Sequence, residues 1–312
     1  MTIVCDRHIP FLVEAVHDHW PDVQIYPMES EQITNAAIRE ADVLVVRTRT
    51  LINEVLLQGS RVRLVCTATI GYDHIDTGWC EAHSIRWMSC PGCNAQAVCD
   101  YVEEALREIE SACVFPNKPV TIGIVGVGHV GSLVADMAKR KGYNVLLNDP
   151  PKGIGVSLDF IAQHCDIITF HTPLDSSTRH LCDEIFLQRC QPRVWIINAA
   201  RGGIVDEQAL LSSGHPYILD TWESEPHLNT EVLAHAFRAS MHIAGYSVEG
   251  KRNATQMCLD TIADTFGLSH IPPISTPVSE GDSALGWLER VSMQLKKQPE
   301  SFELLRKNYP LR

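Results

Sequence analysis

The stretch Thr121-Ile-Gly-Ile-Val-Gly-Val-Gly-His-Val-Gly131 decides the fold of this chain. It places a Gly-x-Gly-x-x-Gly pattern between a β-branched run and the segment Val130–Arg140, whose apolar spacing predicts a helix. Gly126 permits a tight turn, Gly128 lets the backbone approach a pyrophosphate, and Gly131 allows close packing of helix on strand. The pattern therefore predicts a strand–turn–helix unit that binds a dinucleotide at the N-terminus of the helix.

An acidic residue follows the next predicted strand. The run Asn144–Asn148 ends at Asp149, about 20 residues after Gly131, where a carboxylate can accept hydrogen bonds from the ribose hydroxyls of NAD. The same carboxylate would repel the 2′-phosphate of NADP, so we expect NAD as the cofactor. Thr172 follows another apolar run and is expected in a loop that meets the nucleotide, although a simple turn is the alternative.

Short β-branched runs recur along both halves of the chain, separated by stretches long enough for helices. This rhythm predicts an α/β protein with two doubly wound parallel-sheet domains, a flavodoxin-like substrate domain and a Rossmann NAD-binding domain. The runs are Ile3–Cys5, Val23–Ile25, Val43–Val46, Leu64–Cys66, Ile85–Met88, Val120–Val125, Val145–Leu147, Ile167–Phe170, Val194–Ile197 and Ile218–Leu219.

Helix signals set the expected domain boundaries. Asn94 is a predicted N-cap for a joining helix from about Ala95 to Cys113, and Ser247 for a helix near Val248–Phe266. We therefore expect a substrate domain over residues 1–93, with a returning helix at about 248–268, and a NAD-binding domain over residues 94–247.

The last part of the chain differs in composition. The Pro- and Ser-containing stretch Ile271–Ser283 predicts a linker, and short helices are expected near Ala284–Leu295 and Pro299–Arg306. Residues 269–312 are too few for a further domain, so we expect a short C-terminal helical element that serves docking or dimerisation.

Composition limits the classes of partner. The 312 residues carry a formal net charge of −12, which disfavours nucleic acid and anionic membranes as partners. No stretch is long and apolar enough to span a membrane, and the N-terminus has no secretory signal pattern, so we expect a cytoplasmic protein. The 11 cysteines form no disulfide framework, and Cys90-x-x-Cys93 lacks a second ligand pair, so it is interpreted as structural. No metal site is expected.

Three segments place polar residues just after apolar runs, at the edge where open α/β sheets bind ligands. They are Ile197–Gly203, Leu219–Pro226 and Met241–Tyr246. Removing a hydride from a 2-hydroxy acid needs a base for the hydroxyl proton and a cation for the carboxylate. His242 fits the base, and the planar fork of Arg201 fits the carboxylate. Glu225 is expected to orient the imidazole.

Each of these three residues also has a simpler interpretation when it is taken alone. Arg201 could be a charge at a helix N-terminus, Glu225 a loop residue and His242 a hydrogen-bonded core histidine. Together, and in the same chain as a dinucleotide site, they favour catalysis. His171 and His180 are interpreted as structural or surface histidines because no metal-ligand spacing surrounds them.

These motifs resemble the D-isomer-specific 2-hydroxyacid dehydrogenases over residues 1 to about 266. The resemblance implies that Arg201 of Asn-x-x-Arg-Gly, Glu225 of Asp-x-x-x-x-Glu-Pro and His242 before Ile-Ala-Gly act together in catalysis. It assigns Asp220 to the nicotinamide carboxamide, and the spacing makes Glu225 rather than Glu223 the partner of His242. With the glycine pattern, the expected cofactor residues are Gly126, Gly128, His129, Val130, Gly131, Asp149, Thr172, Ala199, Ala200, Asp220 and Gly245.

Within the family, three further motifs resemble the branch that oxidises 4-phospho-D-erythronate at C2 in vitamin B6 synthesis. They are Thr67–Asp76, Pro91–Ala95 and His242–Tyr246. The resemblance implies that Thr48, Thr69 and Tyr246 contact the substrate. Arg47 and Arg49 flank Thr48, and a phosphate needs such donors, although either could be a solvated loop charge.

Two other functions stay open on the sequence alone. The chain could be another 2-hydroxyacid dehydrogenase, acting on 3-phosphoglycerate, glycerate or hydroxypyruvate. It could also be a binding protein that uses NAD as a switch, although the joint presence of Arg201, Glu225 and His242 disfavours this. The expected partners are a small phosphorylated hydroxy acid and a second copy of the chain in a homodimer.

Overall fold

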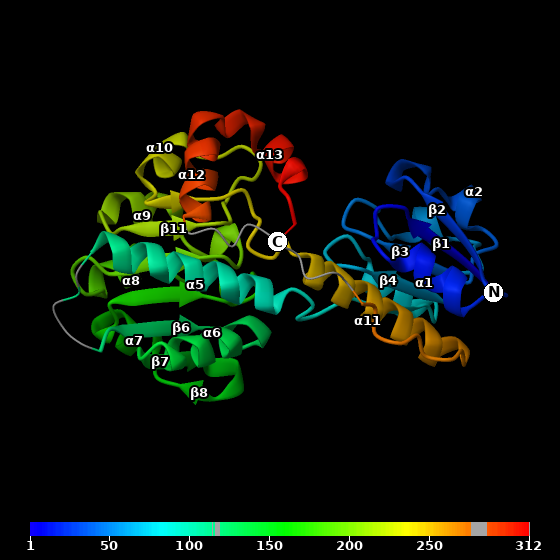
Figure 1. The fold of residues 1–312 in the computed structure, drawn as a ribbon, viewed down its shortest axis with the longest axis horizontal. Helices are drawn as coiled ribbons and strands as arrows, with labels where there is room; N and C mark the ends of the chain where they lie inside the picture. The colour runs from blue at the N-terminus through cyan, green and yellow to red at the C-terminus, as the bar shows by residue number, and fades with distance from the viewer. Residues whose placement is uncertain (114, 116–118, 276–285, 312) are drawn as a thin grey trace. The chain divides into compact units, whose positions relative to one another are not determined.

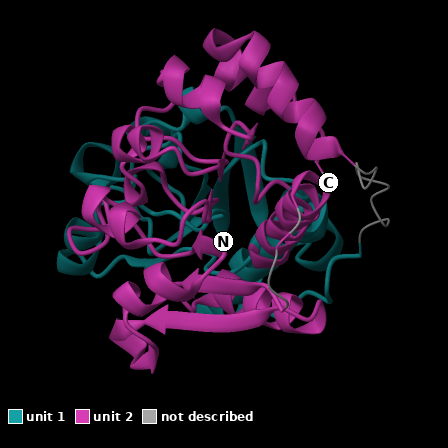
Figure 2. Cartoon of the chain, turned by 90° about the vertical axis from the view of Figure 1, so that its left-hand side faces the viewer, with its two compact units in different colours: residues 1–94, 247–279 teal, residues 95–246, 280–312 magenta. Residues whose placement is uncertain are grey.

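The structure is a computed structural model that describes residues 1–113, 115, 119–275 and 286–311. The chain folds into two compact units, residues 1–94 with 247–279, and residues 95–246 with 280–312 (Figure 2). The segment predicted as a tail is thus divided: residues 269–275 lie in the first unit and 286–311 in the second. The stretch 276–285, which holds most of the predicted linker and the start of the first tail helix, falls outside the described residues.

The first unit is built on a five-stranded parallel sheet of order β2-β1-β3-β4-β5 (Figure 1). The helices connect successive strands, and α11 is added from the far end of the sequence. The strands are β1 Thr2–Asp6, β2 Gln24–Met28, β3 Val43–Val46, β4 Leu64–Thr67 and β5 Arg86–Met88. The helices are α1 Leu12–His19, α2 Asn35–Ile38, α3 Glu54–Leu57, α4 Thr77–Ala82 and α11 Val248–Phe266, with a 3-10 turn at Ser30–Gln32.

Both faces of this sheet are covered, which explains why its central strands are apolar without alternation. In β3, Val43 and Val45 pack into one core cluster, while Leu44 and Val46 pack into another on the opposite face. Successive side chains of a strand point to opposite faces, so a fully buried strand needs two separate cores.

Helix α11 completes the first of these clusters with Ala254, Cys258, Leu259 and Ile262. The N-cap predicted at Ser247 is confirmed, because the Ser247 hydroxyl accepts a hydrogen bond from the Gly250 N–H at 2.9 Å. The N-cap predicted at Asn94 is wrong, because its Oδ1 is buried and accepts no hydrogen bond within the described residues.

The Cys90-x-x-Cys93 motif is structural in this unit. The Cys90 thiol donates to the carbonyl oxygens of Thr67 and Ala254, both at 3.3 Å, and lies 3.8 Å from the Cys258 sulfur. Cys90 thus contacts both α11 and the end of β4, and it anchors the returning helix to that strand.

The second unit contains a seven-stranded sheet of order β12-β11-β10-β9-β6-β7-β8. All neighbouring strands are parallel except β7 and β8, which pair antiparallel at one edge. The strands are β6 Thr121–Val125, β7 Asn144–Asp149, β8 Ile154–Gly155, β9 Ile167–Phe170, β10 Trp195–Asn198, β11 Tyr217–Leu219 and β12 Arg238–Ala239.

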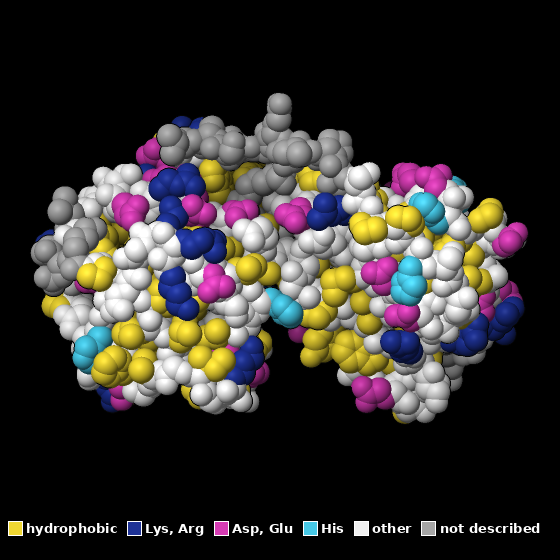
Figure 3. Space-filling model, turned by 60° about the horizontal axis from the view of Figure 1, so that its bottom comes forward, with side chains coloured by type: hydrophobic (Ala, Val, Ile, Leu, Met, Phe, Trp, Pro, Cys, Tyr) yellow, Lys and Arg dark blue, Asp and Glu magenta, His cyan; other side chains and the backbone are white. Residues whose placement is uncertain are grey.

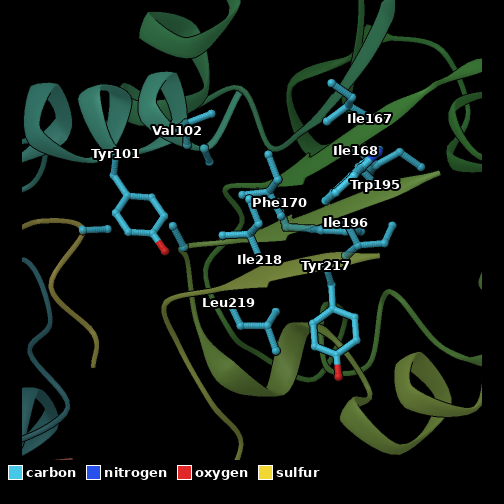
Figure 4. Packing of buried hydrophobic residues seen from close by; sticks show 14 of the residues in the cluster. Tyr101, Val102, Ile167, Ile168, Phe170, Trp195, Ile196, Tyr217, Ile218 and Leu219 are labelled. Carbon is cyan, nitrogen blue, oxygen red and sulfur yellow. The ribbon is translucent and has the colours of Figure 1, made fainter. Parts of the chain in front are cut away.

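Helices surround this second sheet, with 3-10 turns at Pro150–Lys152, Gly202–Ile204 and Pro299–Ser301. The helices are α5 Ala95–Ala112, α6 His129–Arg140, α7 Leu158–His164, α8 Glu184–Arg189, α9 Glu207–Ser213, α10 Thr230–His235, α12 Trp287–Lys297 and α13 Phe302–Asn308. Figure 4 shows Tyr101 of α5 pointing toward the strand residues Phe170 and Ile218 in the shared core.

Helix α12 closes the β12 edge of this sheet. Its buried residues Trp287, Leu288 and Leu295 belong to the main core of the second unit. The Ser292 hydroxyl accepts a hydrogen bond from the Ala239 N–H at 3.0 Å, which satisfies a donor of the edge strand. Helix α12, which lies in the segment predicted as a separate tail, therefore belongs to the second unit.

On the face drawn in Figure 3, Lys and Arg side chains are interspersed with Asp, Glu and hydrophobic side chains and form no continuous basic strip. Within the described ranges, no helix has both the length and the apolar character that crossing a bilayer requires. The described residues also contain no group of three or more His, Cys, Asp or Glu side chains arranged to hold a metal ion.

Candidate active site

The glycine turn lies at the point where the order of the second sheet reverses. Strand β6 has β7 on one side and β9 on the other, and ligands of open α/β sheets bind beside such a switch point. Gly126 has φ +89°, and a Cβ there would lie 2.7 Å from the carbonyl carbon of His171. A Cβ on Gly131 would lie 1.9 Å from the Gly126 oxygen, whereas one on Gly128 would meet nothing within 4 Å. Gly126 and Gly131 are therefore required by packing, and Gly128 borders open space.

Asp149 is fixed against this turn. Its Oδ2 accepts a hydrogen bond from the Val127 N–H at 2.8 Å, and the Lys152 ammonium lies 3.9 Å away. The carboxylate is held at the end of β7, next to the N-terminus of α6, as ribose recognition in this kind of fold requires.

Two residues follow β9 at the same edge of the sheet. The His171 N–H donates to the Val125 carbonyl at 2.7 Å, and its Nε2 lies 3.0 Å from the Thr169 hydroxyl. Burial lowers the pKa of His171 to about 3, so the ring is neutral and structural. The Thr172 hydroxyl is buried and has no hydrogen-bond partner within the part of the chain that the structure describes. A buried hydroxyl without a partner is costly, and a polar ligand at this position would satisfy it. The residues around the turn therefore fit a dinucleotide.

His242 and Glu225 form a directly hydrogen-bonded pair. The His242 Nδ1–H donates to Oε2 of Glu225 at 2.8 Å, and Oε1 accepts from the Trp222 N–H at 2.9 Å. Burial opposes ionisation of Glu225, but the hydrogen bond and charge of His242, the Trp222 N–H and the charge of Arg306 together lower its pKa. When ionised Glu225 accepts the hydrogen bond from Nδ1–H of His242, Nε2 of the same imidazole is left to exchange protons with a ligand.

Asp220 supports the loop that carries His242. The Asp220 side chain is enclosed at 0% exposure and accepts hydrogen bonds from the Ser240 hydroxyl at 2.6 Å, the Ile243 N–H at 2.8 Å and the Ala244 N–H at 2.9 Å. The backbone of His242 is left-handed, with φ +57°, and its N–H donates to the Asp220 carbonyl at 2.8 Å. Asp220 thus stabilises a backbone conformation that is uncommon for residues other than glycine.

Arg201 projects from a loop that Asn198 holds in place. The Asn198 side chain is buried, donates to the Arg201 carbonyl at 2.8 Å and accepts from the Ala200 N–H at 3.1 Å. Nη1 of Arg201 donates to the Ala200 carbonyl at 2.8 Å. Across the described ranges, no carboxylate lies within ion-pair distance of this guanidinium. A positive charge without a protein counter-ion, on a fixed loop, is suited to an anionic ligand.

The neighbouring acidic residues have other partners. Glu223 contacts Nε2 of His180, whose Nδ1 lies 3.7 Å from Asp206, so His242 pairs with Glu225 and not with Glu223.

Sequence reasoning missed Glu207. This residue is 5% exposed, and its Oε1 accepts the Glu223 N–H at 2.7 Å. Burial, together with the charges of Glu223, Glu225 and Asp206, raises the pKa of Glu207 to about 7. It begins α9 and could not be distinguished in the sequence from a solvated first-turn glutamate.

The remaining candidates lie in the first unit, after β3 and β4. Arg47 forms a two-point ion pair with the buried Asp6, with Nε at 2.9 Å and Nη2 at 3.2 Å from its oxygens. Thr48 and Arg49 are exposed. The Thr69 hydroxyl lies 2.7 Å from that of Thr67 and donates to the Gly71 carbonyl at 3.0 Å. The structure thus groups Arg47, Thr48 and Thr69 in one unit, and Arg201, Glu225, His242 and Tyr246 in the other.

Comparison with known proteins identifies the family of this chain. Residues 108–244 match the family model for the D-isomer specific 2-hydroxyacid dehydrogenase, NAD binding domain. The erythronate-4-phosphate dehydrogenase of Bacteroides thetaiotaomicron is 40% identical over all of this chain and 97% of its own length. The chain belongs to the erythronate-4-phosphate dehydrogenase family. The family member of Porphyromonas gingivalis is 38% identical, over 99% of this chain and 92% of its own length.

Solved structures of other dehydrogenases share the fold at lower sequence identity. The 3-phosphoglycerate dehydrogenase of Entamoeba histolytica, solved with NAD⁺, has a TM-score of 0.70 and 24% identity over 89% of this chain and 99% of its own. At this identity the likeness concerns the fold, and the substrate has to be argued from the site.

Proposed function

We propose that this protein oxidises 4-phospho-D-erythronate to 2-oxo-3-hydroxy-4-phosphobutanoate with NAD, as a step in the synthesis of pyridoxal 5′-phosphate (vitamin B6). The observation that carries the proposal is the 2.8 Å hydrogen bond between His242 and Glu225. The same unit holds Arg201, whose guanidinium has no counter-ion among the described residues. Relatives from Bacteroides thetaiotaomicron, Bacteroides fragilis and Porphyromonas gingivalis, which match 99–100% of this chain, are named erythronate-4-phosphate dehydrogenase and support the choice of substrate.

Arg201, Glu225 and His242 are proposed to share the chemistry. Arg201 binds the substrate carboxylate and polarises the carbonyl that forms at C2. Nε2 of His242 takes the proton of the C2 hydroxyl, and Glu225 orients the ring and stabilises its positive charge. Bound NAD would supply the acceptor for the hydride that leaves C2. In the reverse direction His242 returns its proton to the oxygen.

The cofactor is proposed to lie along the edge of the second sheet. The residues assigned to it are Gly126, Gly128, His129, Val130, Gly131, Asp149, Thr172, Ala199, Ala200, Asp220 and Gly245. The buried Thr172 hydroxyl, which has no hydrogen-bond partner among the described residues, and the open space at Gly128 support this assignment. For Asp220 the proposal includes its role in holding the loop that carries His242.

The first unit is proposed as the substrate domain. Thr48 and Thr69 offer hydroxyls at the ends of two neighbouring strands, and Tyr246 adds a phenol from the second unit. Arg47 keeps the loop of Thr48 in place through its ion pair with Asp6, and we assign it a substrate contact as well.

We propose that the protein works in the cytoplasm as a homodimer. The pKa values of several cysteine thiols, among them Cys5, Cys165 and Cys190, are raised by burial, and such thiols suit a reducing compartment. The dimer would be tested by light scattering of the purified protein.

The substrate is tested by NADH formation with 4-phospho-D-erythronate, 3-phosphoglycerate and D-glycerate offered side by side. We expect kcat/KM for 4-phospho-D-erythronate to exceed the other two by at least about tenfold. The variant Arg201→Lys serves as a matched control that keeps the charge but loses the fork, and we expect it to lose about 3 kcal/mol of transition-state stabilisation. A clear preference for one of the other acids would refute the proposed substrate.

A further inference from the structure

Arg306 lies in α13, close to residues of the candidate active site in the same unit. Its guanidinium carbon is 5.7 Å from the centre of the Tyr246 ring. Its charge also acts on Glu225, the partner of His242. A residue from the end of the chain therefore lies beside a residue proposed to bind substrate and near one proposed to orient the base.

The position of α13 is fixed by packing. Phe302 is fully buried and Leu305 is 9% exposed, and both belong to the main core of the second unit. Tyr246 packs against the same core. Because Phe302 and Leu305 anchor the helix, the side chain of Arg306 has a fixed origin next to Tyr246.

The hydrogen-bonding capacity of Arg306 is largely unused within the described residues. Among the described residues, the carboxylate within ion-pair distance of Arg306 is that of Glu303, one turn earlier, at 3.6 Å and 55% exposed. A solvent-exposed ion pair of this kind contributes little to the stability of the fold. The Nε atom of Arg306 is buried and has no hydrogen-bond partner among the described residues. A buried guanidinium N–H without an acceptor is costly, and an anionic ligand would satisfy it.

The proposed substrate needs a second cation. A 4-phospho-2-hydroxy acid carries a carboxylate at one end and a phosphate at the other, and Arg201 is assigned to the carboxylate. Nε and Nη2 of Arg47 are engaged by the buried carboxylate of Asp6, which largely neutralises the charge of Arg47. Within the described ranges, Arg306 has no comparable partner.

We propose that Arg306 is a substrate-binding residue that recognises the phosphate end of the substrate, with Tyr246 packed beside it. This inference rests on the proposed function and deepens it. It makes the C-terminal helix part of the specificity site, in addition to any part it has in assembly. The guanidinium fork is suited to two hydrogen bonds with phosphate oxygens, which an unphosphorylated acid lacks.

The test compares Arg306→Gln with the wild-type enzyme on 4-phospho-D-erythronate and on unphosphorylated D-erythronate. We expect KM for the phosphorylated acid to rise roughly tenfold to a hundredfold, while kcat/KM for D-erythronate changes less than about threefold. Arg306→Lys should restore only part of the preference, because it keeps the charge and loses the fork.

Lys307→Gln is the matched control, since it removes the same charge from the next, exposed residue of the helix. It should leave both substrates unaffected. If Arg306→Gln weakens both acids equally, or lowers the melting temperature without changing their ratio, Arg306 is structural and the inference is wrong. If the wild-type enzyme itself does not oxidise 4-phospho-D-erythronate, the proposed function has failed and the phosphate subsite fails with it. Activity of the wild-type enzyme thus tests the proposed substrate, and Arg306→Gln tests the phosphate-binding role of Arg306.

Discussion

Glu225 shows how one carboxylate can support catalysis and stability together. It is paired on both oxygens, by His242 and by the Trp222 N–H. Its pKa in the folded protein is lower than the ordinary 4.5, so its stabilising contribution is present above that value and is lost as the pH falls through the lowered one. The enzyme should therefore be robust at neutral pH and lose this contribution in acid.

The variant Glu225→Gln tests this pair. We expect kcat/KM to fall by roughly two orders of magnitude, because an amide cannot stabilise the positive imidazole that forms during oxidation. The melting temperature, measured between pH 3 and pH 8, should lose its Glu225-dependent decline below about pH 4.5. An unchanged rate and an unshifted pH profile would show that the hydrogen bond has no catalytic role.

The pKa of Glu207 is shifted in the opposite direction to that of Glu225. Burial and neighbouring carboxylates raise its pKa to about 7, so the folded protein holds the proton more tightly than the unfolded chain. The favourable contribution is present below about pH 4.5 and is lost as the pH rises through about 7.

We predict that Glu207→Gln melts at the same temperature as the wild type near pH 5 and at a higher temperature near pH 8. Glutamine keeps the oxygen that accepts the Glu223 N–H, so the loop before Glu225 should hold its shape. The exposed Glu300→Gln is the control and should show no such pH dependence. An equal shift at both pH values would mean that ionisation of Glu207 is not what destabilises the protein.

The residues that sequence reasoning found differ in kind from those it missed. Arg201, Glu225 and His242 each follow a predicted strand within a recognisable motif, so local sequence was sufficient. Glu207 and Arg306 matter through burial and through contacts with residues far along the chain. Neither property is visible in a local pattern.

At the level of elements, the predicted strand bounds agree with the observed ones where both faces of the strand are buried. Strands β3 and β9 have the predicted bounds, and α11 begins and ends where expected. Strands β8 and β12 have two residues each, too short for any periodic signal, and β8 runs antiparallel. The short helices α2 and α3 have four residues each and depend on caps at Thr34 and Asn53 more than on an apolar face.

The junction of β6 and α6 yields a paired prediction. Gly131→Ala should destabilise the fold by about 2–4 kcal/mol, because its Cβ would meet backbone at 1.9 Å. Gly128→Ala should change stability by less than about 1 kcal/mol, since a Cβ there meets nothing, yet it should raise KM for NAD by narrowing the approach of the pyrophosphate.

Denaturant unfolding and NAD titrations of the two variants measure both effects. The expectation fails if Gly128→Ala unfolds as easily as Gly131→Ala, or if it binds NAD as well as the wild type.

At the scale of the molecule, the C-terminal segment completes the second unit. A chain ending before Gly286 would lose the core residues Trp287, Leu288 and Phe302 and the Ser292 cap of β12. We expect its melting temperature to fall by on the order of 10 °C, with loss of activity. A control chain ending after Pro310 keeps α12 and α13 and should resemble the wild type. Normal melting of the shorter chain would mean that the helices are dispensable for folding.

The path of the chain through the two units bears on synthesis at the ribosome. Residues 1–94 emerge first, but the cluster around Val43 and Val45 needs α11, which is translated about 170 residues later. At roughly 5–20 residues per second, the nascent N-terminal sheet waits on the order of ten to thirty seconds with one apolar face uncovered. During that interval the growing polypeptide would be a client for chaperones, and substitutions that slow translation would prolong the exposure.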